Sequence, residues 1–218
     1  MSDAAWPECV RFYFSFRSPY SWLALHRVHA ALEPAGVAIE YVPVFPPPDF
    51  ANDPLKFPQK ALYYREDITR IARAYGYGFV VPAPFDCNWL RPHAAWIYAH
   101  DQARGPAFAK TMCEARFARG ENLGDDAVVG ACALAAGLEA AATVAAQDAL
   151  PYQERLMNGM IRGATEDNIF GVPLFVYRGE RFWGNDRIEW LLRRISERRG
   201  LAVADLASGP MSPIYPTA

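Results

Sequence analysis

The stretch FYFSFRSPYSW, residues 12–22, holds the strongest structural signal in the chain. It completes an apolar run from Val10 to Phe16 that is rich in β-branched and aromatic residues and short enough for a buried strand. Ser18 and Pro19 then favour a helix start, because serine is a good N-cap residue and proline is preferred at the first helical position. The sequence therefore predicts a strand that leads through a turn directly into a helix, with Ser18 at the helix N-terminus.

The residues after this turn extend the pattern to a strand–helix–strand unit. Apolar residues recur at helical spacing as far as Leu32, and Pro34 and Gly36 end the helix. A second apolar run, Val37 to Phe45, has the composition of a strand. Two strands joined by one helix are expected to be parallel neighbours with a right-handed crossover.

The middle of the chain, by contrast, carries only helical patterns. Helices are predicted over residues 59–75, 93–103, 105–119, 125–137, 139–147 and 150–164. Strand character returns at Val172 to Tyr177 and Arg181 to Trp183, and an amphipathic helix, Asp186 to Arg199, closes the pattern. With the helical block removed, the order βαβ…ββα is the thioredoxin plan, so we predict an α/β thioredoxin-like fold with an inserted all-α domain.

The same pattern divides the chain into expected domains. Residues 8–50 and 166–200 would form a discontinuous thioredoxin-like domain, residues 51–165 the inserted helical domain, and residues 201–218 a C-terminal tail.

Composition narrows the function classes. The chain has 218 residues with a net charge of -2, which does not suggest a nucleic-acid partner. No secretory signal and no apolar run of membrane-spanning length is visible, so a cytoplasmic location is expected. The four cysteines are Cys9, Cys87, Cys113 and Cys132. No two of them are separated by only two residues, so neither a CxxC redox pair nor a zinc site is predicted.

Ser18 has two interpretations at this point. In thioredoxin-like redox proteins a Cys-x-x-Cys motif occupies this helix start, whereas here residues 18–21 read SPYS, so thiol–disulfide exchange at this place is excluded. A serine hydroxyl can still donate a hydrogen bond to a thiolate that a ligand brings, and glutathione is the natural candidate. Alternatively, Ser18 is only an N-cap worth about 1 kcal/mol.

Two later segments bear on this choice. The sequence FGVPLF, residues 170–175, places Pro173 at a strand start, where thioredoxin-like folds carry a cis proline opposite the active-site helix; an ordinary trans proline is the alternative. The sequence FWGNDR, residues 182–187, leads through Gly184 into the last helix. Asn185 or Asp186 is expected to cap that helix, or Asp186 could accept the ammonium of a γ-glutamyl group.

Together these segments resemble the 2-hydroxychromene-2-carboxylate isomerases and, slightly less closely, the kappa-class glutathione transferases, both of the DsbA-like branch of the thioredoxin superfamily. The shared features are the strand-SPYSW start, the helical insertion, the GVP strand and the WGNDR turn, which span residues 10 to about 195. The resemblance implies a thioredoxin-like fold of the DsbA and kappa-transferase type.

The resemblance also implies roles for individual residues. Ser18 would activate the glutathione thiol, and Val172, held by Pro173, would pair its backbone with the cysteinyl part. The implied γ-glutamyl pocket consists of Trp183, Gly184, Asn185 and Asp186. An Asn and a Lys of the family match Asn52 and Lys60; the alternative for Lys60 is a solvated helix charge. The candidate substrate contacts are Arg17, Asn88 and Tyr63, and Arg17 could instead point to solvent.

The activity implied by this resemblance is a glutathione-dependent isomerisation of a 2-hydroxychromene-2-carboxylate-like aromatic catabolite, by reversible thiolate addition. Two alternatives stay open. A kappa-type glutathione S-transferase would consume glutathione, and a non-catalytic glutathione-binding thioredoxin-like protein would bind it without turnover. The expected partner is a small aromatic molecule, with no nucleic acid or membrane, and a homodimer is compatible with the family.

Overall fold

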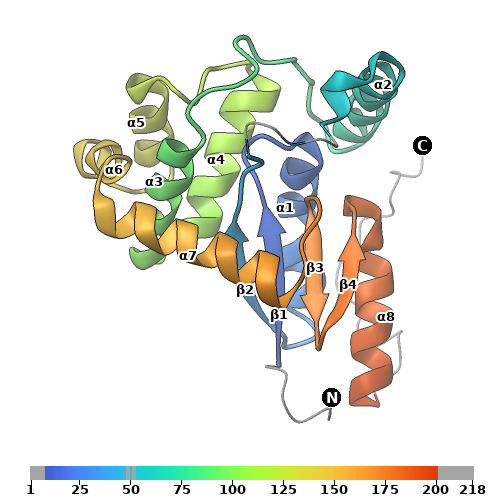
Figure 1. Cartoon of the computed structure of the whole chain (residues 1–218). Helices are drawn as coiled ribbons and strands as arrows, with labels where there is room; N and C mark the ends of the chain where they lie inside the picture. The colour runs from blue at the N-terminus through green and yellow to red at the C-terminus, as the bar shows by residue number, and fades with distance from the viewer. Residues whose placement is uncertain (1–7, 48–49, 51–52, 201–218) are drawn as a thin grey trace.

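The computed structural model describes residues 8–47, 50 and 53–200 of the chain. Its centre is a four-stranded sheet with the order β2-β1-β3-β4, in which β1 and β2 are parallel and β3 is antiparallel to both β1 and β4 (Figure 1). The strands are β1 (Cys9–Phe14), β2 (Ala38–Pro43), β3 (Leu174–Tyr177) and β4 (Glu180–Trp183). This mixed sheet confirms the predicted thioredoxin-like fold.

The βα turn forms as the sequence predicts. Helix α1 (Pro19–Leu32) has Ser18 as its N-cap residue, and the Ser18 side chain accepts a hydrogen bond from the backbone N–H of Ser21. Strand β1 is two residues shorter at its end than predicted, because the backbone N–H groups of Ser15 and Phe16 bond to side chains instead of a neighbouring strand.

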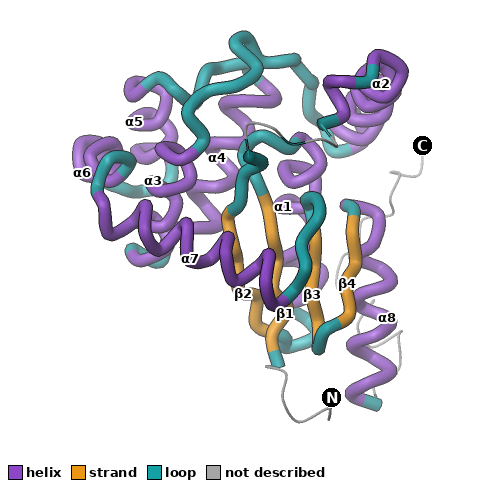
Figure 2. The backbone as a smooth tube through the Cα atoms, in the orientation of Figure 1, coloured by secondary structure: helices purple, strands orange, loops and turns teal. Residues whose placement is uncertain are grey.

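The block between β2 and β3 contains helices where the sequence predicts them. They are α2 (Pro58–Ala74), α3 (Leu90–Asp101), α4 (Gly105–Ala118), α5 (Asp126–Ala135), α6 (Ala140–Ala146) and α7 (Leu150–Glu166), preceded by the short 3-10 helix η2 (Pro54–Lys56). Figure 2 shows that the strands of the described part lie together in one sheet and that this block is helical. No helix within the described residues is both long and apolar enough to cross a bilayer.

The end of the sheet corrects one prediction. The closing helix α8 (Ile188–Arg199) is capped by neither Asn185 nor Asp186, because both belong to a turn of 3-10 helix, η3 (Asn185–Arg187), that precedes it. Gly184 stands before this turn with a φ of 121°, a backbone conformation that favours glycine. The side chains of Asn185 and Asp186 therefore serve neither as the predicted cap nor as part of α8.

Helices cover both faces of the sheet (Figure 1). Alternate residues of a strand point to opposite faces, so Phe12 and Phe14 pack toward α1 and α8, whereas Tyr13 packs toward α7 with Leu174 and Val176. Cover on both faces explains why the central strands β1 and β3 are buried nearly throughout rather than alternating between buried and exposed residues.

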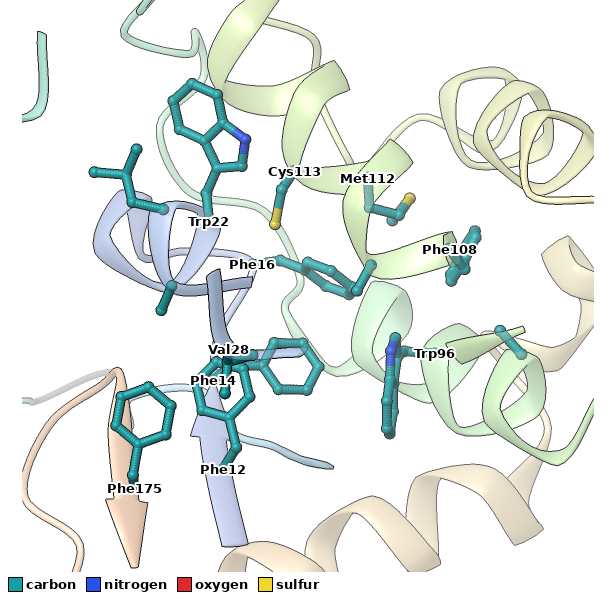
Figure 3. Close-up of a cluster of buried hydrophobic side chains, with 14 of the residues drawn as sticks. Phe12, Phe14, Phe16, Trp22, Val28, Trp96, Phe108, Met112, Cys113 and Phe175 are labelled. Carbon is teal, nitrogen blue, oxygen red and sulfur yellow. The ribbon is translucent and has the colours of Figure 1, made fainter. Parts of the chain in front are cut away.

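The larger core continues from the sheet into the helical block. Figure 3 shows Phe12 of β1 beside Phe175 of β3, Phe14 of β1 facing Trp96 of α3, and Phe16 extending toward Met112 of α4. One cluster of buried side chains thus spans both of the predicted domains within the described residues. The division at residues 50/51 and 165/166 stays a prediction, and the predicted tail, 201–218, lies outside the described residues.

Two glycines of α7 face the sheet at different distances, so replacing each by alanine is expected to change the stability in opposite directions. A Cβ on Gly163 would lie 2.7 Å from Cε1 of Tyr13, whereas a Cβ on Gly159 would lie 3.6 Å from its nearest neighbour, Val42. Gly159→Ala is expected to stabilise the protein by about 0.5–1 kcal/mol through helix propensity. Gly163→Ala is expected to destabilise it by about 1–3 kcal/mol through overpacking.

Denaturant unfolding of the two variants beside the wild type measures both effects. Because both residues lie in the same helix, propensity alone would shift both variants in the same direction. Stabilisation by Gly163→Ala would contradict the close packing of α7 on Tyr13.

Candidate functional site

The hydroxyl of Ser18 lies between the start of α1 and the loop before β3. Its Oγ accepts from the Ser21 N–H at 3.2 Å, and its O–H points to the backbone oxygen of Val172 at 3.5 Å. The second contact is at the long limit for an O–H donor, for which about 2.7–2.8 Å is usual. The hydroxyl hydrogen of Ser18 is therefore weakly held and can turn to a ligand atom.

The loop opposite Ser18 has the geometry expected from the sequence. The Val172–Pro173 peptide bond is cis. Pairing between β1 and β3 extends only to Leu174, so Val172 lies outside the ladder. The backbone N–H of Gly184 donates to the oxygen of Pro173 at 3.0 Å. The structure thus brings the SPYS, GVP and WGNDR segments together at one end of the sheet.

The γ-glutamyl candidates are placed unequally around this loop. Trp183 is 51% exposed and packs edge-on against Phe170, and its indole nitrogen would lie 2.8 Å from a Cβ on Gly171. Asp186 is exposed and pairs with the neighbouring Arg187. Asn185, in contrast, is only 6% exposed, so its side chain lies within the protein rather than on an open surface.

Arg17, the residue before Ser18, is held by two carboxylates. Its Nε lies 2.7 Å from Asp86 and its Nη2 lies 2.8 Å from Asp53, while its guanidinium stacks 5.0 Å from the Phe85 ring centre. Burial opposes the charge of Arg17, but these carboxylates raise its pKa overall. The arginine therefore ties the turn at Ser18 to the loops before α2 and α3.

The remaining candidates lie on the helical block. Lys60 and Tyr63 are exposed residues of α2, and the Lys60 ammonium lies 4.6 Å from the Phe57 ring centre. Helix α2 itself is attached to α1 by the Tyr20 hydroxyl, which donates to Asp67 at 2.8 Å. Asn88 is exposed, and its side-chain oxygen accepts from the Leu90 N–H at the start of α3. The predicted contact Asn52 lies outside the described residues.

Four consecutive backbone N–H groups of the βα turn have partners other than a strand. Ser15 N–H donates to Ser21 Oγ at 3.2 Å, Phe16 N–H to His93 Nε2 at 3.1 Å, and Arg17 N–H to Ser15 Oγ at 3.2 Å. Ser18 N–H donates to the Ser15 oxygen at 3.1 Å. Buried backbone groups require such partners, so these bonds define the path of the turn that carries Ser18.

Three residues of this site were missed by sequence reasoning: Asp53, Asp86 and His93. The two aspartates are 36 and 69 residues from Arg17 along the chain. A lone histidine 77 residues from Phe16 likewise carries no motif. Only folding brings such separate residues together, and no sequence spacing could have identified them.

The buried imidazole of His93 makes stability depend on acidity. Burial lowers the pKa of His93 to about 4, and the Arg116 guanidinium acts in the same direction, against a hydrogen bond to the Trp89 backbone. In the unfolded chain the pKa of histidine is about 6.5. Below that pH the unfolded chain binds a proton at this histidine that the folded chain does not bind. Stability is therefore lost as the pH falls from about 6.5 toward about 4, by up to about 3 kcal/mol.

Denaturant unfolding across this pH window checks the expectation. His93→Gln, which cannot titrate there, is expected to lack this component of the pH dependence. An equal fall in stability for wild type and variant would contradict it.

Comparison with known proteins agrees with the fold. A family model described as a DSBA-like thioredoxin domain matches residues 9–196. A 2-hydroxychromene-2-carboxylate isomerase of Pseudomonas putida is 28% identical over 211 residues, which cover 91% of this chain and 99% of that protein. The isomerase of the same description from Sphingobium xenophagum is 27% identical over 191 residues, 84% of this chain and 96% of that protein.

A solved structure gives the same result in three dimensions. The structure of a selenomethionine-containing 2-hydroxychromene-2-carboxylate isomerase superposes with a TM-score of 0.75 at 25% identity and covers 91% of this chain and 99% of that one. The family match spans most of the chain, including every strand of the described sheet and the SPYS turn. The chain therefore belongs to the DSBA-like thioredoxin domain family.

Proposed function

We propose that this protein is a glutathione-dependent isomerase that acts on 2-hydroxychromene-2-carboxylate or a closely similar aromatic catabolite. The observation that carries the proposal is the Ser18 hydroxyl at the N-terminus of α1, 3.5 Å from the Val172 oxygen, in a chain that is similar to such isomerases over most of its length. A cysteine at Ser18 would favour redox chemistry, and its absence supports an isomerase over a disulfide oxidoreductase.

The residues around Ser18 fit a peptide-like thiol. Val172 lies outside the sheet ladder, so its backbone N–H and C=O can pair with a ligand backbone. Gly171 and Gly184 keep the backbone open beside Trp183 and Asp186, because a Cβ at either glycine would come within 2.8 Å of those side chains. We infer that Val172 binds the cysteinyl part, and that Trp183, Gly184 and Asp186 accept the γ-glutamyl part.

The proposal assigns no direct ligand contact to the side chain of Asn185. Because its side chain is buried, Asn185 contributes through the turn that it builds rather than through its amide. Asn52 and Lys60 stay proposed glutathione contacts, and Tyr63 and Asn88 stay proposed substrate contacts. A substrate carboxylate at Arg17 would have to share the guanidinium with Asp53 or Asp86.

The protein's own contribution is to hold a thiolate in place. Bound glutathione would supply a nucleophilic sulfur that adds reversibly to a conjugated double bond and so permits rotation. The Ser18 O–H donates a hydrogen bond to that sulfur, and the positive end of α1 favours its negative charge by about 0.3–1 kcal/mol, or up to about 2 when partly buried. The Ser18 oxygen and the start of α1 are in place before binding, so only the hydroxyl hydrogen has to turn.

An assay of 2-hydroxychromene-2-carboxylate with and without glutathione tests the proposal. We expect the isomer to form only when glutathione is present, with total thiol unchanged after many turnovers. Stoichiometric loss of thiol would instead identify a kappa-type transferase. Glutathione binding without turnover, on this substrate and on a panel of conjugated enones, would identify a non-catalytic binding protein. We also propose a cytoplasmic location, where glutathione is kept reduced.

A further inference from the structure

His93 of α3 lies directly behind the turn that carries Ser18. Its side chain is fully buried, and its ring packs 4.9 Å from the ring of Phe16, measured between centres. Nε2 lies 3.1 Å from the Phe16 backbone nitrogen and 3.4 Å from Ser15 Oγ, and Nδ1 lies 2.7 Å from the Trp89 backbone oxygen. No sequence motif and no step of the proposed reaction accounts for this histidine.

The partners of His93 determine its tautomer. A backbone N–H can only donate, so Nε2 must be the acceptor for Phe16. A backbone carbonyl can only accept, so Nδ1 must carry the hydrogen that Trp89 receives. The imidazole is therefore neutral, with its single hydrogen on Nδ1.

Ser15 is compatible with this arrangement. Its Oγ accepts from the Arg17 N–H, and its own hydrogen can face Nε2 of His93 only as a long, secondary contact at 3.4 Å, because the single lone pair of Nε2 already accepts from Phe16. His93 and Ser15 together thus hold the N–H groups of Phe16, Arg17 and Ser18, the last through the Ser15 carbonyl. His93, a residue of the helical insertion, thus accepts the hydrogen bond from Phe16 that a neighbouring strand would accept if β1 continued.

We propose that His93, as the neutral Nδ1–H tautomer, is a positioning residue for Ser18: its Nε2 fixes the turn that aims the Ser18 hydroxyl at the ligand sulfur. This inference rests on the proposed function of Ser18. The expected effect is large for a buried bond, because a displacement of about 1 Å at a reacting group can cost about 10²-fold in rate.

Two substitutions separate the two nitrogens. The side-chain oxygen of His93→Gln can replace Nε2 as the acceptor for Phe16, but the bond to Trp89 is lost. The amide of His93→Asn can replace Nδ1 as the donor to Trp89, but the acceptor for Phe16 is lost. Each variant loses one buried hydrogen bond, so similar shifts of the denaturation midpoint are expected.

The catalytic rates of His93→Asn and His93→Gln should differ, although their stabilities are similar. We expect kcat of His93→Asn to fall about 10-fold to 10²-fold, with KM for the aromatic substrate changed less, and the ultraviolet titration of bound glutathione to show a thiol pKa raised toward its free value. His93→Gln should stay within a few-fold of wild type on both measures. Equal kinetics for the two variants, or full activity of His93→Asn, would overturn the proposal.

Nuclear magnetic resonance of the wild type gives a readout that is independent of activity and of variant folding. The imidazole nitrogen shifts should show a protonated Nδ1 and an unprotonated Nε2. An Nε2–H or charged imidazole at neutral pH would refute the proposal. If wild type fails to ionise glutathione while these shifts hold, the proposed function fails and the tautomer assignment stands.

Discussion

Ser18→Ala is expected to lower glutathione-dependent turnover by about 10²-fold or more. The loss follows from removing a fixed hydrogen-bond donor to a developing or stabilised negative charge, as in an oxyanion hole. In the structure this hydroxyl has only a 3.5 Å contact with the Val172 oxygen to compete with a ligand. Steady-state kinetics on 2-hydroxychromene-2-carboxylate, with the thiol pKa of bound glutathione measured in parallel, provides the check.

Two further substitutions at Ser18 separate its chemistry from its role as a helix cap. Alanine also removes the bond to Ser21 and should cost about 1 kcal/mol of stability, whereas glycine at an N-cap costs only a few tenths. Ser18→Gly should therefore be nearly as stable as wild type and as inactive as Ser18→Ala. Ser18→Thr retains a hydroxyl and is expected to keep activity. Unchanged turnover in Ser18→Ala and Ser18→Gly would remove Ser18 from the mechanism.

Asp167→Ala is expected to lower the free energy of unfolding by about 3–5 kcal/mol. The Asp167 carboxylate, at the C-terminal end of α7, has no exposed side-chain surface; Tyr13 donates to it at 2.5 Å and the Arg11 guanidinium lies 3.1 Å away. Burial and this carboxylate both raise the pKa of Tyr13, so the phenol stays protonated and continues to donate. Without Asp167, a buried hydroxyl and a largely buried cation lose a partner together.

Glu166 supplies a matched control for this prediction. It binds the same Arg11 at 3.1 Å, but 55% of its side chain is exposed. Because solvent screens such a pair, Glu166→Ala should cost about 0–1 kcal/mol. Denaturant unfolding of both variants at neutral pH makes the comparison, and similar losses would show that burial does not decide the strength of these two ion pairs.

Local signals in the sequence were sufficient for the elements and for part of the site. The Ser18-Pro19 pair marked the start of α1 correctly, since capping depends on residues within one turn. The same kind of signal gave the order of elements along the chain, βαβ, then a helical block, then ββα. The closing helix shows the limit of such signals. Asparagine is a residue type that often caps helices, but Asn185 follows Gly184 into a 3-10 turn instead.

The contacts between distant segments could not be predicted in this way. Arg17 looked like a free cation in the sequence, and the structure places it between Asp53 and Asp86. His93 had no motif at all, yet it holds the turn at Phe16. These pairs depend on how α3 and the loops before α2 and α3 pack against the end of β1, which is set by the apolar core as a whole.

The sequence by itself determined the strand–turn–helix that presents Ser18, because hydrophobic periodicity, capping and proline placement act over a few residues. It also excluded a CxxC thiol pair at this position, because that depends on residue identity alone. Tertiary structure alone decided which groups surround Ser18: the Val172 carbonyl, the neutral His93 and the two carboxylates on Arg17. Hydrogen bonds and ion pairs act only over a few ångströms, so residues tens of positions apart acquire these roles when the core brings them together.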